Sequence, residues 1–337
     1  MRAMSLTAIA SLEQNPAPLQ LVELPVPVPG RNEVLVRVAA CGVCHTELDE
    51  IEGRTPPPGL PVVPGHEVVG FVEQVGAEVT SLKAGERVGV GWIFGSSGDQ
   101  DENLSDRFVA TGRDVNGGYA EYMTVGADYA YPIPEVFSAA EAAPLLCAGA
   151  VGYRALRLAG ITNGQSLGLT GFGGSGHLVL QLARHMYPAS DVLVFARSEK
   201  EQEFALQLGA AWAGATEDVP PELLHAIIDT TPAWLPVLAA LAVLRPGGRL
   251  VVNAIRKESA DRHLLAEIDY AAHLWMEKEL KTVANVTHTD IAEFLEIAAQ
   301  IPLRPEVRTF ALEDANEALM SLRTGHIRGA NVLLIMS

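Results

Sequence analysis

The chain has 337 residues, 48% of them hydrophobic, and a formal net charge of −17. This length corresponds to one large domain or two ordinary domains with substantial cores. A chain this acidic is poorly suited to bind nucleic acid or an anionic membrane surface, and we expect neither as a partner.

Three cysteines are too few, and odd in number, for a disulfide framework. The N-terminus lacks the apolar core of a signal peptide. The sequence also contains no apolar run of about 18 residues or more, the length that a membrane span requires. We therefore expect a cytoplasmic protein whose thiols are reduced.

The first part of the chain is typical of a β-rich domain. Residues 33–41, 66–76 and 85–92 alternate apolar and polar residues or form short apolar runs bounded by glycine. Proline clusters at 25–30 and 56–65 indicate loops and sheet edges. This pattern predicts a folded-over β-barrel with long excursions.

The pattern changes near Glu141. Residues 140–160 have helical spacing that ends at Gly160, and a strand, a glycine turn and a helix follow over 166–186. Further strands are expected at 191–196, 226–231 and 247–254, with helical segments between them. Alternating strands and helices predict a parallel, doubly wound sheet. The tail, 312–335, is typical of a helix, a turn and a strand, and we expect it to return to the first domain.

The segment "GFGGSG" carries a phosphate-binding pattern. Gly171, Gly173 and Gly176 have G-x-G-x-x-G spacing, with Gly174 inside the turn, after a predicted strand and before a predicted helix. Such glycines let the backbone approach a pyrophosphate, which the helix N-terminus then binds. The alternative is an ordinary glycine-rich turn between a strand and a helix.

The end of the next strand bears on which dinucleotide is bound. NAD-selective sites carry a carboxylate there, and this sequence has Ala196 and Arg197 instead. Arg197, Ser198 and Lys200 can hold a 2′-phosphate, which favours NADP(H) over NAD(H). In the alternative, the two cations are solvated and Glu199 binds the ribose.

Two cysteines and one histidine form a candidate metal site. His66 follows Cys44 by 22 residues, and Cys147 lies 81 residues further on. Thiolate and imidazole are zinc ligands, and three protein ligands leave a coordination position open, as in a catalytic site. From spacing alone, either Cys41 or Cys44 can be the first ligand.

The segments "GVCHTEL", "GHEVVG", "PLLCAG" and "TGFGGSGH" occur in this order, together with "ENLSDRF" and "NGGYAEYM". In these segments the chain resembles, over nearly its whole length, the zinc-dependent alcohol dehydrogenases of the medium-chain dehydrogenase/reductase superfamily. The resemblance implies a GroES-like β-rich catalytic domain, residues 1–150 and 288–337, and a Rossmann cofactor domain with a doubly wound parallel sheet, residues 151–287.

The resemblance also implies the activity. It predicts an NAD(P)-dependent alcohol dehydrogenase or aldehyde reductase that takes a small primary alcohol or aldehyde and forms a homodimer or homotetramer. Its site residues are, by resemblance, the zinc ligands Cys44, His66 and Cys147, the acidic neighbour Glu67, the proton relay Thr46, the pyrophosphate contacts His45 and Arg328, and the pocket residue Trp92. Cys41 then becomes a buried strand residue, and Glu47 stands where aspartate is more usual.

The chain departs from the family in two places. Many relatives bind a second, structural zinc with four cysteines, but residues 92–108 contain no cysteine, so we expect one catalytic zinc per chain. Asp99, Asp101 and Glu102 in this stretch are expected to be solvated charges, with a hard cation as the alternative. Asp49 replaces a histidine that ends the proton relay in several relatives, which leaves the outer relay open.

Two rival functions remain to be weighed. A zinc-independent quinone or enoyl reductase of the same superfamily would lack the metal ligands, so Cys44, His66 and Cys147 argue against it. A nucleotide-binding protein without turnover is the second rival. The complete ligand set and the glycine turn argue against it, and Asp49 is its only support.

Overall fold

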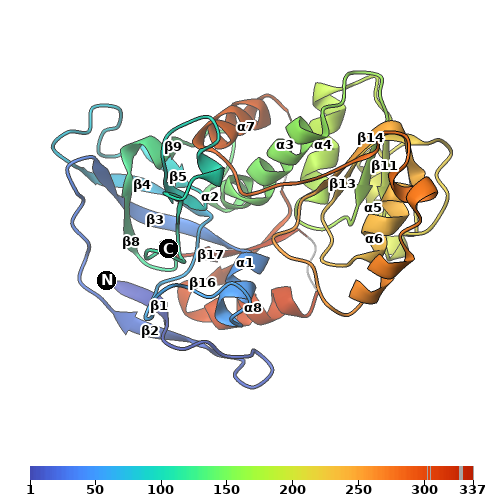
Figure 1. Ribbon diagram of the computed structural model, residues 1–337. Coiled ribbons are helices and arrows are strands. Elements are labelled where there is room, and N and C mark those ends of the chain that lie inside the picture. Colours follow the sequence, from blue (N-terminus) through green and yellow to red (C-terminus); the bar gives the residue numbers. More distant parts are fainter. Residues whose placement is uncertain (302, 304, 326–328, 337) are drawn as a thin grey trace. The chain divides into compact units, whose positions relative to one another are not determined.

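The computed structural model describes residues 1–336 apart from 302, 304 and 326–328, and it divides into two compact units (Figure 1). Unit 1 consists of Met1–Ala150 and Asn285–Ser337, and unit 2 of Val151–Ala284. Whether the chain folds as separate domains with the bounds expected from the sequence stays a prediction. No helix among the described residues is long and apolar enough to cross a bilayer.

Unit 1 is built on a seven-stranded sheet. Its strands follow the order β16–β17–β3–β4–β5–β9, and β8 pairs with β3 beside this path. Their bounds are β3 (Glu33–Val43), β4 (Val68–Val75), β5 (Arg87–Val90), β8 (Tyr122–Gly126), β9 (Tyr131–Pro132), β16 (Val307–Ala311) and β17 (Ala330–Leu334). Two small sheets accompany it, formed by β1 (Arg2–Leu6) with β2 (Leu19–Glu23) and by β6 (Ile93–Gly95) with β7 (Val109–Ala110).

The central strand β3 carries most of the packing of this unit. Val34, Val36 and Val38 alternate into one core cluster, and the second half of the strand is buried throughout. β-branched side chains suit such a pleated, buried surface. The tail strand β17 pairs antiparallel with β3, with Leu333 opposite Cys41, so the tail returns to unit 1 as expected.

Short helices connect these strands. They are α1 (His45–Ile51), α2 (Ala139–Ala142), α7 (His288–Gln300) and α8 (Ala315–Arg323), with the 3-10 turns η1 (Glu102–Leu104), η2 (Ala127–Tyr129), η3 (Ala143–Leu146) and η6 (Leu312–Asp314). Several begin with a capping box, in which the side chains of the cap residue and of the third helical residue satisfy backbone groups reciprocally. Thr287 and Asp290 form such a box at the start of α7.

The helix expected over 140–160 is interrupted at Cys147. The chain forms α2 and η3, leaves helical geometry at Cys147 (φ −125°, ψ −76°), and resumes as α3 (Ala148–Ala159). Pro144, which lacks a backbone donor, lies in the 3-10 turn. The prediction of a continuous helix was therefore wrong at Cys147, which is a candidate metal ligand. Gly160 ends α3 with φ +67°, as its position predicts.

The acidic stretch without cysteines is held by Glu102, contrary to expectation. Glu102 is 0% exposed, and its Oε1 accepts a hydrogen bond from the His288 backbone N–H at 2.6 Å and lies 2.7 Å from His288 Nδ1. The Tyr129 hydroxyl donates to Oε2 at 2.8 Å. Asp99 and Asp101 are exposed, so only these two match the expectation of solvated charges.

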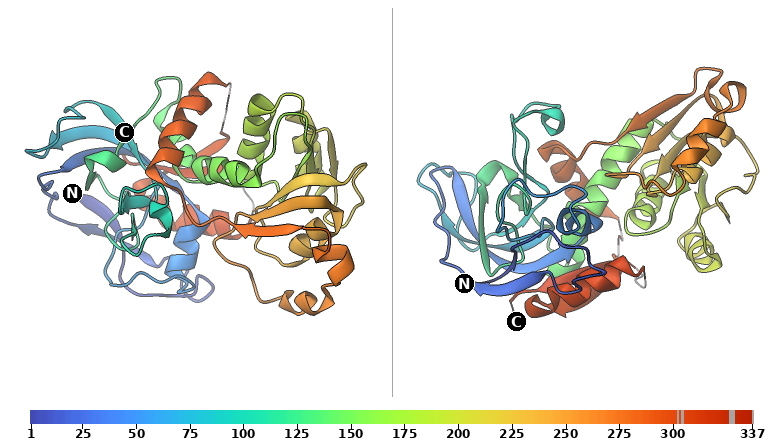
Figure 2. Two further views of the ribbon diagram at one scale, coloured as in Figure 1. Left: turned by 45° about the horizontal axis from the view of Figure 1, so that its top comes forward. Right: turned by 60° about the horizontal axis from the view of Figure 1, so that its bottom comes forward.

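Unit 2 is a six-stranded parallel sheet in the order β12–β11–β10–β13–β14–β15. Its strands are β10 (Leu167–Thr170), β11 (Val192–Phe195), β12 (Trp212–Gly214), β13 (Leu224–Asp229), β14 (Leu244–Val252) and β15 (Glu279–Thr282). Figure 2 shows helices on both sides of this sheet. They are α4 (Gly176–Met186), α5 (Glu199–Gln207) and α6 (Leu235–Val243), followed by the 3-10 segment η4 (Arg262–Glu267) and the π segment η5 (Tyr270–Leu274).

The order of the strands reverses between β10 and β13. From β10 the chain first moves outward through β11 and β12, and then returns to the other side of β10 with β13. Such a reversal is the topological switch point, where open α/β sheets bind ligands at the carboxyl ends of the strands. β14 lies inside the sheet, and β15 forms its edge.

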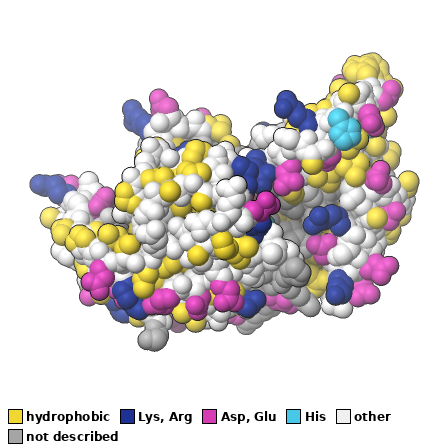
Figure 3. Space-filling view, turned by 90° about the horizontal axis from the view of Figure 1, so that it is seen from below, with side chains coloured by type: hydrophobic (Ala, Val, Ile, Leu, Met, Phe, Trp, Pro, Cys, Tyr) yellow, Lys and Arg dark blue, Asp and Glu magenta, His cyan; other side chains and the backbone are white. Residues whose placement is uncertain are grey.

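Charge is mixed on the surface. On the face drawn in Figure 3, Asp and Glu side chains are interspersed with Lys and Arg side chains. The net charge of −17 is therefore not gathered into one acidic patch on this face.

Candidate active site

Cys44 lies where β3 passes into α1. It is the N-cap of α1, with φ −109° and ψ 162°, and its backbone N–H donates to Glu47 Oε2 at 2.8 Å. The Glu47 carboxylate thus satisfies a backbone donor at a helix start. This capping box turns the strand into the helix directly at the candidate ligand.

Four side chains from three segments meet in unit 1. The ligand atoms of Cys44, His66, Glu67 and Cys147 all lie within 4.8 Å of one another, and the two sulfur atoms are 4.0 Å apart. His66 and Glu67 directly precede β4, and Cys147 separates η3 from α3. His66 is 1% exposed and Glu67 is 3% exposed. We call this group the Cys-His-Glu cluster.

Two glycines make room for the cluster. A Cβ at Gly42 would lie 1.8 Å from Glu67 Oε2, so any side chain there would displace the carboxylate. Gly65 has φ +101°, a conformation that L side chains rarely adopt, and it directly precedes His66. The sequence "PGHE" therefore sets the position of the imidazole and of the carboxylate through its backbone.

Glu47 also reaches the imidazole. Its Oε1 lies at ion-pair distance, 2.6 Å, from His66 Nδ1, and neither ring nitrogen of His66 makes a hydrogen bond of regular geometry among the described residues. Metal-ligating histidines usually present the second ring nitrogen to a carboxylate, which fixes the orientation of the ring. One carboxylate thus positions two candidate ligands, Cys44 through its backbone and His66 through its ring.

The electrostatics of the cluster favour the metal-binding form at one position, the thiolate of Cys44, whereas a charged His66 ring must lose its proton before it can bind a metal ion. A hydrogen bond from Cys147 lowers the pKa of the Cys44 thiol well below its usual value, with a further contribution from His66. Burial opposes a charged His66 ring, but Glu47 and Cys44 together outweigh it and raise the pKa of the imidazole. Burial raises the pKa of Glu67. The hydrogen bond with Cys44, together with burial, raises the pKa of the Cys147 thiol, so a bound cation would have to displace its proton.

The donor set fits a zinc ion. In a tetrahedral site with Zn–S of about 2.3 Å and Zn–N of about 2.0 Å, ligand atoms lie roughly 3.3–3.8 Å apart. The ligand atoms of the cluster are at most 4.8 Å apart, so a contraction of about 1 Å would bring them to tetrahedral distances. A buried Nε2 without a partner is the kind of orphaned atom that a metal would satisfy.

Thr46 and Trp92 lie next to the cluster. Thr46 is 7% exposed, and its Oγ1 is 3.6 Å from Cys44 Sγ. The Trp92 ring centroid lies 6.0 Å from that of His66 and 5.9 Å from that of Phe108, and its Nε1 has no hydrogen-bond partner among the described residues. Cys41 is fully buried in β3 and is not a member of the cluster.

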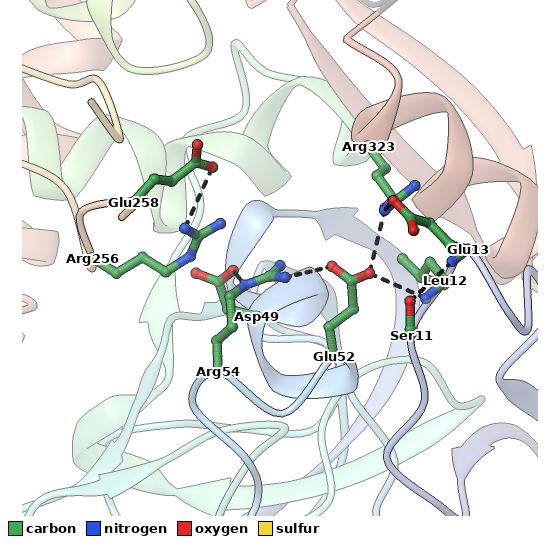
Figure 4. Close-up of polar contacts among 9 residues, drawn as sticks. All are labelled: Ser11, Leu12, Glu13, Asp49, Glu52, Arg54, Arg256, Glu258 and Arg323. Atoms are coloured by element: carbon green, nitrogen blue, oxygen red, sulfur yellow. Dashed lines mark hydrogen bonds and ion pairs between the residues drawn. The ribbon is translucent and has the colours of Figure 1, made fainter. Parts of the chain in front are cut away.

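Asp49 is engaged by a cation. It is 2% exposed, and its Oδ1 accepts a hydrogen bond from Arg54 Nε at 2.5 Å. Figure 4 shows Arg54 between Asp49 and Glu52, with Glu52 in turn contacting Arg323. Asp49 is therefore part of an ion-pair chain at the end of α1.

The glycine turn follows β10 in unit 2. Gly171 has φ +82°, and a Cβ there would lie 2.8 Å from Thr230 Oγ1. A Cβ at Gly176, the first residue of α4, would lie 2.6 Å from the Gly171 carbonyl oxygen. Gly173 and Gly174 face open space. The turn thus combines two tight contacts with an open stretch of backbone, as a pyrophosphate site requires.

The remaining candidate cofactor residues differ in their surroundings. Arg197, Lys200 and Glu199 are exposed at the start of α5. Ser198 is the N-cap of this helix, and its Oγ accepts from the Glu201 backbone N–H at 3.3 Å. His45 is exposed at the start of α1. Arg328 lies outside the described residues.

Sequence reasoning understated Glu47. It identified a conservative replacement of aspartate, whereas in the structure this side chain contacts both Cys44 and His66. The signal was its position, three residues after a cap residue at the start of a predicted helix.

Known proteins resemble this chain along nearly all of its length. The family model of the alcohol dehydrogenase GroES-like domain matches residues 30–135. The "Probable alcohol dehydrogenase AdhA" of Mycobacterium tuberculosis is 40% identical over 329 residues, covering 94% of this chain and 93% of that protein. An alcohol dehydrogenase of Geobacillus stearothermophilus is 34% identical and covers 97% and 99%, respectively.

A solved structure agrees with these relatives. A cinnamyl alcohol dehydrogenase from Sorghum bicolor superposes with a TM-score of 0.83 at 26% identity, covering 99% of this chain and 97% of that one. Together with the Cys-His-Glu cluster and the glycine turn, these similarities show that the chain belongs to the zinc-dependent alcohol dehydrogenases of the medium-chain dehydrogenase/reductase superfamily and is an NAD(P)-dependent oxidoreductase acting on alcohols.

Proposed function

We propose that the protein transfers hydride between NAD(P)(H) and a primary alcohol or aldehyde, with one catalytic zinc held by Cys44, His66 and Cys147. The observation that carries this proposal is the Cys-His-Glu cluster, whose buried His66 Nε2 has no partner among the described residues. Three ligands with an open fourth position suit catalysis, because a substrate oxygen can occupy that position.

The zinc ion, when bound, supplies Lewis-acid polarisation of the substrate oxygen. The chain supplies the rest of the chemistry. Thr46 relays a proton through Oγ1 to that oxygen as hydride reaches the carbonyl carbon, and its own proton is replaced from solvent; in the reverse reaction the proton passes outward by the same route. Glu47 keeps the His66 ring in orientation through the 2.6 Å contact at Nδ1. Glu67 offers a carboxylate beside the metal, which can bind the metal transiently when the substrate position is empty.

Trp92 is proposed to line the substrate pocket. Its ring packs beside His66, and its buried Nε1–H has no hydrogen-bond partner among the described residues. An aromatic wall with a single donor favours a substrate with an apolar body next to its oxygen.

The cofactor is proposed to bind at the glycine turn, Gly171–Gly176, with its pyrophosphate at the N-terminus of α4. By resemblance, His45 and Arg328 contact the same pyrophosphate. Arg197 and Lys200 are exposed cations beyond the end of β11, and they support a preference for NADP(H), with Ser198 beside them. Exposed Glu199 supports the alternative, NAD(H), so the ratio of kcat/KM for NADPH and NADH decides between the two.

We propose a cytoplasmic homodimer or homotetramer. The support is the edge strand β15, whose four residues are all exposed, with Leu280 50% exposed. Tyr270 and Trp275 before it are also more than half exposed. An exposed edge with apolar neighbours is suited to pairing with a second copy. Sedimentation velocity gives the number of subunits. β15 is the candidate contact, because it forms the edge of the sheet and β14 lies inside it.

The test uses a matched pair of cysteine variants. Aldehyde-dependent oxidation of NADPH and of NADH is measured for the wild-type protein, for Cys44→Ala and for Cys41→Ala. Cys44→Ala is expected to abolish both bound zinc and turnover. Cys41→Ala, which removes a buried thiol outside the cluster, is expected to retain both. Turnover by a zinc-free Cys44→Ala protein would contradict the proposal and favour a zinc-independent reductase.

A further inference from the structure

A buried ion pair lies at the switch point of the parallel sheet, and the reaction chemistry does not use it. Asp229, the last residue of β13, is 0% exposed. Its Oδ1 accepts hydrogen bonds from Thr170 Oγ1 at 2.6 Å, from Thr231 Oγ1 at 2.8 Å and from the Thr231 backbone N–H at 3.1 Å. Asp229 therefore bridges the carboxyl ends of β10 and β13, the two strands between which the strand order reverses.

Lys257 completes the network from the segment after β14. Its side chain is 10% exposed, and Nζ donates to Asp229 Oδ2. Nζ also donates to the carbonyl oxygens of Thr231 at 2.8 Å and of Ala233 at 3.0 Å. The three N–H groups of the ammonium are thus all used. Lys257 has no donor left for a substrate, so it acts through the segments that it joins.

The network is in contact with the glycine turn. Thr230 lies between Asp229 and Thr231 in the chain, and its Oγ1 donates a hydrogen bond to the Thr170 carbonyl oxygen at 3.0 Å. A Cβ at Gly171 would lie 2.8 Å from the same Oγ1 and 2.9 Å from Thr231 Cγ2. Because interiors are close-packed, a shift of residues 230–231 displaces the first glycine of the turn.

We propose that Asp229 and Lys257 are a positioning pair for the dinucleotide. They hold the ends of β10 and β13 and the segment after β14 in one arrangement, so that the crevice at the switch point is preformed. The proposal rests on the proposed function, because it takes the glycine turn as the cofactor site. Buried ion pairs are often no more stabilising than apolar residues of the same volume, so a role in geometry accounts for this pair better than a role in stability.

The test replaces both charges at once. Lys257→Met alone leaves a buried carboxylate unpaired and endangers folding, whereas Asp229→Asn combined with Lys257→Met keeps the volumes and removes both charges. Arg184→Met is the matched control, because Arg184 is a cation of the same unit that donates to a backbone carbonyl, that of Leu208, from the far part of α4. Dissociation constants for NADPH and NADH, kcat at saturating cofactor, zinc per chain and the urea midpoint are measured for all three proteins.

The double variant is expected to bind both cofactors about tenfold more weakly, because a preorganised site loosens when its supporting residues are removed. Its kcat at saturating cofactor and its zinc content are expected to match the wild type, and Arg184→Met is expected to bind like the wild type. A loss that only follows the urea midpoint, shared by Arg184→Met, overturns the proposal. So does an unchanged dissociation constant in a folded double variant. If the wild-type protein binds neither cofactor, the proposed function fails first, and this inference with it.

Discussion

Two buried clusters of polar side chains in this molecule differ in whether their polar atoms have hydrogen-bond partners. In unit 2, both carboxylate oxygens of Asp229 and all three N–H groups of Lys257 have partners within the chain. In unit 1, His66 Nε2 has none among the described residues, although it is just as deeply buried.

This difference distinguishes a structural ion pair from a candidate metal site. Nearly all buried polar groups in folded proteins are hydrogen-bonded, so a saturated network needs nothing more than the chain itself. A buried imidazole nitrogen without a partner, such as His66 Nε2 between two thiols and a carboxylate, is costly unless something absent from the polypeptide completes it. The Cys-His-Glu cluster is thus the place where a metal is expected, and the Asp229–Lys257 pair is scaffold.

Apart from replacement of a ligand itself, the largest effect on zinc affinity is expected at Glu47, which contacts both Cys44 and His66. Glu47→Gln should lower zinc affinity by roughly 10- to 100-fold, because the carboxylate that orients His66 becomes a neutral amide. Competition with a zinc chelator measures the affinity. Glu52→Gln changes another carboxylate at the opposite end of α1, so it serves as the control. Equal zinc affinity in both variants and the wild type would remove Glu47 from the site.

Glu102, whose two carboxylate oxygens both accept hydrogen bonds, is expected to contribute to stability rather than to zinc binding. Glu102→Gln is expected to reduce the free energy of unfolding by about 1–3 kcal/mol, because the amide places a donor against Tyr129 or His288. Asp101→Asn, an exposed neighbour, should have little effect. Urea unfolding measures both, with zinc content expected to stay unchanged. A stable Glu102→Gln protein would show that this stretch is held by packing alone.

A pH dependence of stability is expected at Glu50. Burial, with a contribution from Glu47, raises the pKa of this carboxyl to about 9, and its Oε1 has no partner among the described residues. Between pH 4.5, the ordinary pKa of a glutamate side chain, and about pH 9, the folded state holds a proton that the unfolded state has released. The stability of the zinc-free protein should therefore fall as pH rises through this window, by at most about 1.4 kcal/mol per pH unit.

Glu50→Gln keeps the shape without the titration, so it should flatten this decline. Urea unfolding of chelator-treated protein at several pH values between 6 and 9 compares the two slopes. Parallel curves for the variant and the wild type would mean that Glu50 does not carry the extra proton.

Local patterns predicted the glycine turn and the strands β3, β4, β5, β10, β11, β13, β14 and β17, whereas shorter strands such as β1, β2, β12 and β15 were not predicted. The valines of β3 alternate into the core, and the glycines at 171–176 are needed for turn geometry, so both features can be read from a few neighbouring residues. The tail strand was also predicted, because its apolar run is continuous.

Features that depend on distant partners were not predicted. The burial of Glu102 follows from its contacts with Tyr129 and His288 rather than from local spacing. The helix break at Cys147 lies at a residue whose sulfur contacts Cys44 from another segment. The contact between Glu47 and His66 joins α1 to the loop before β4. Tertiary contacts of this kind override local propensity and composition, because a charged residue is buried wherever the fold supplies its partners.

The most direct test of the account is the amount of zinc per chain, measured by metal mass spectrometry on protein purified without chelators. A value near one is predicted, because the chain has one Cys-His-Glu cluster among its described residues and no cysteine in the stretch that binds a structural zinc in relatives. A value near zero that persists after zinc is supplied would contradict the catalytic metal site and favour a zinc-independent reductase.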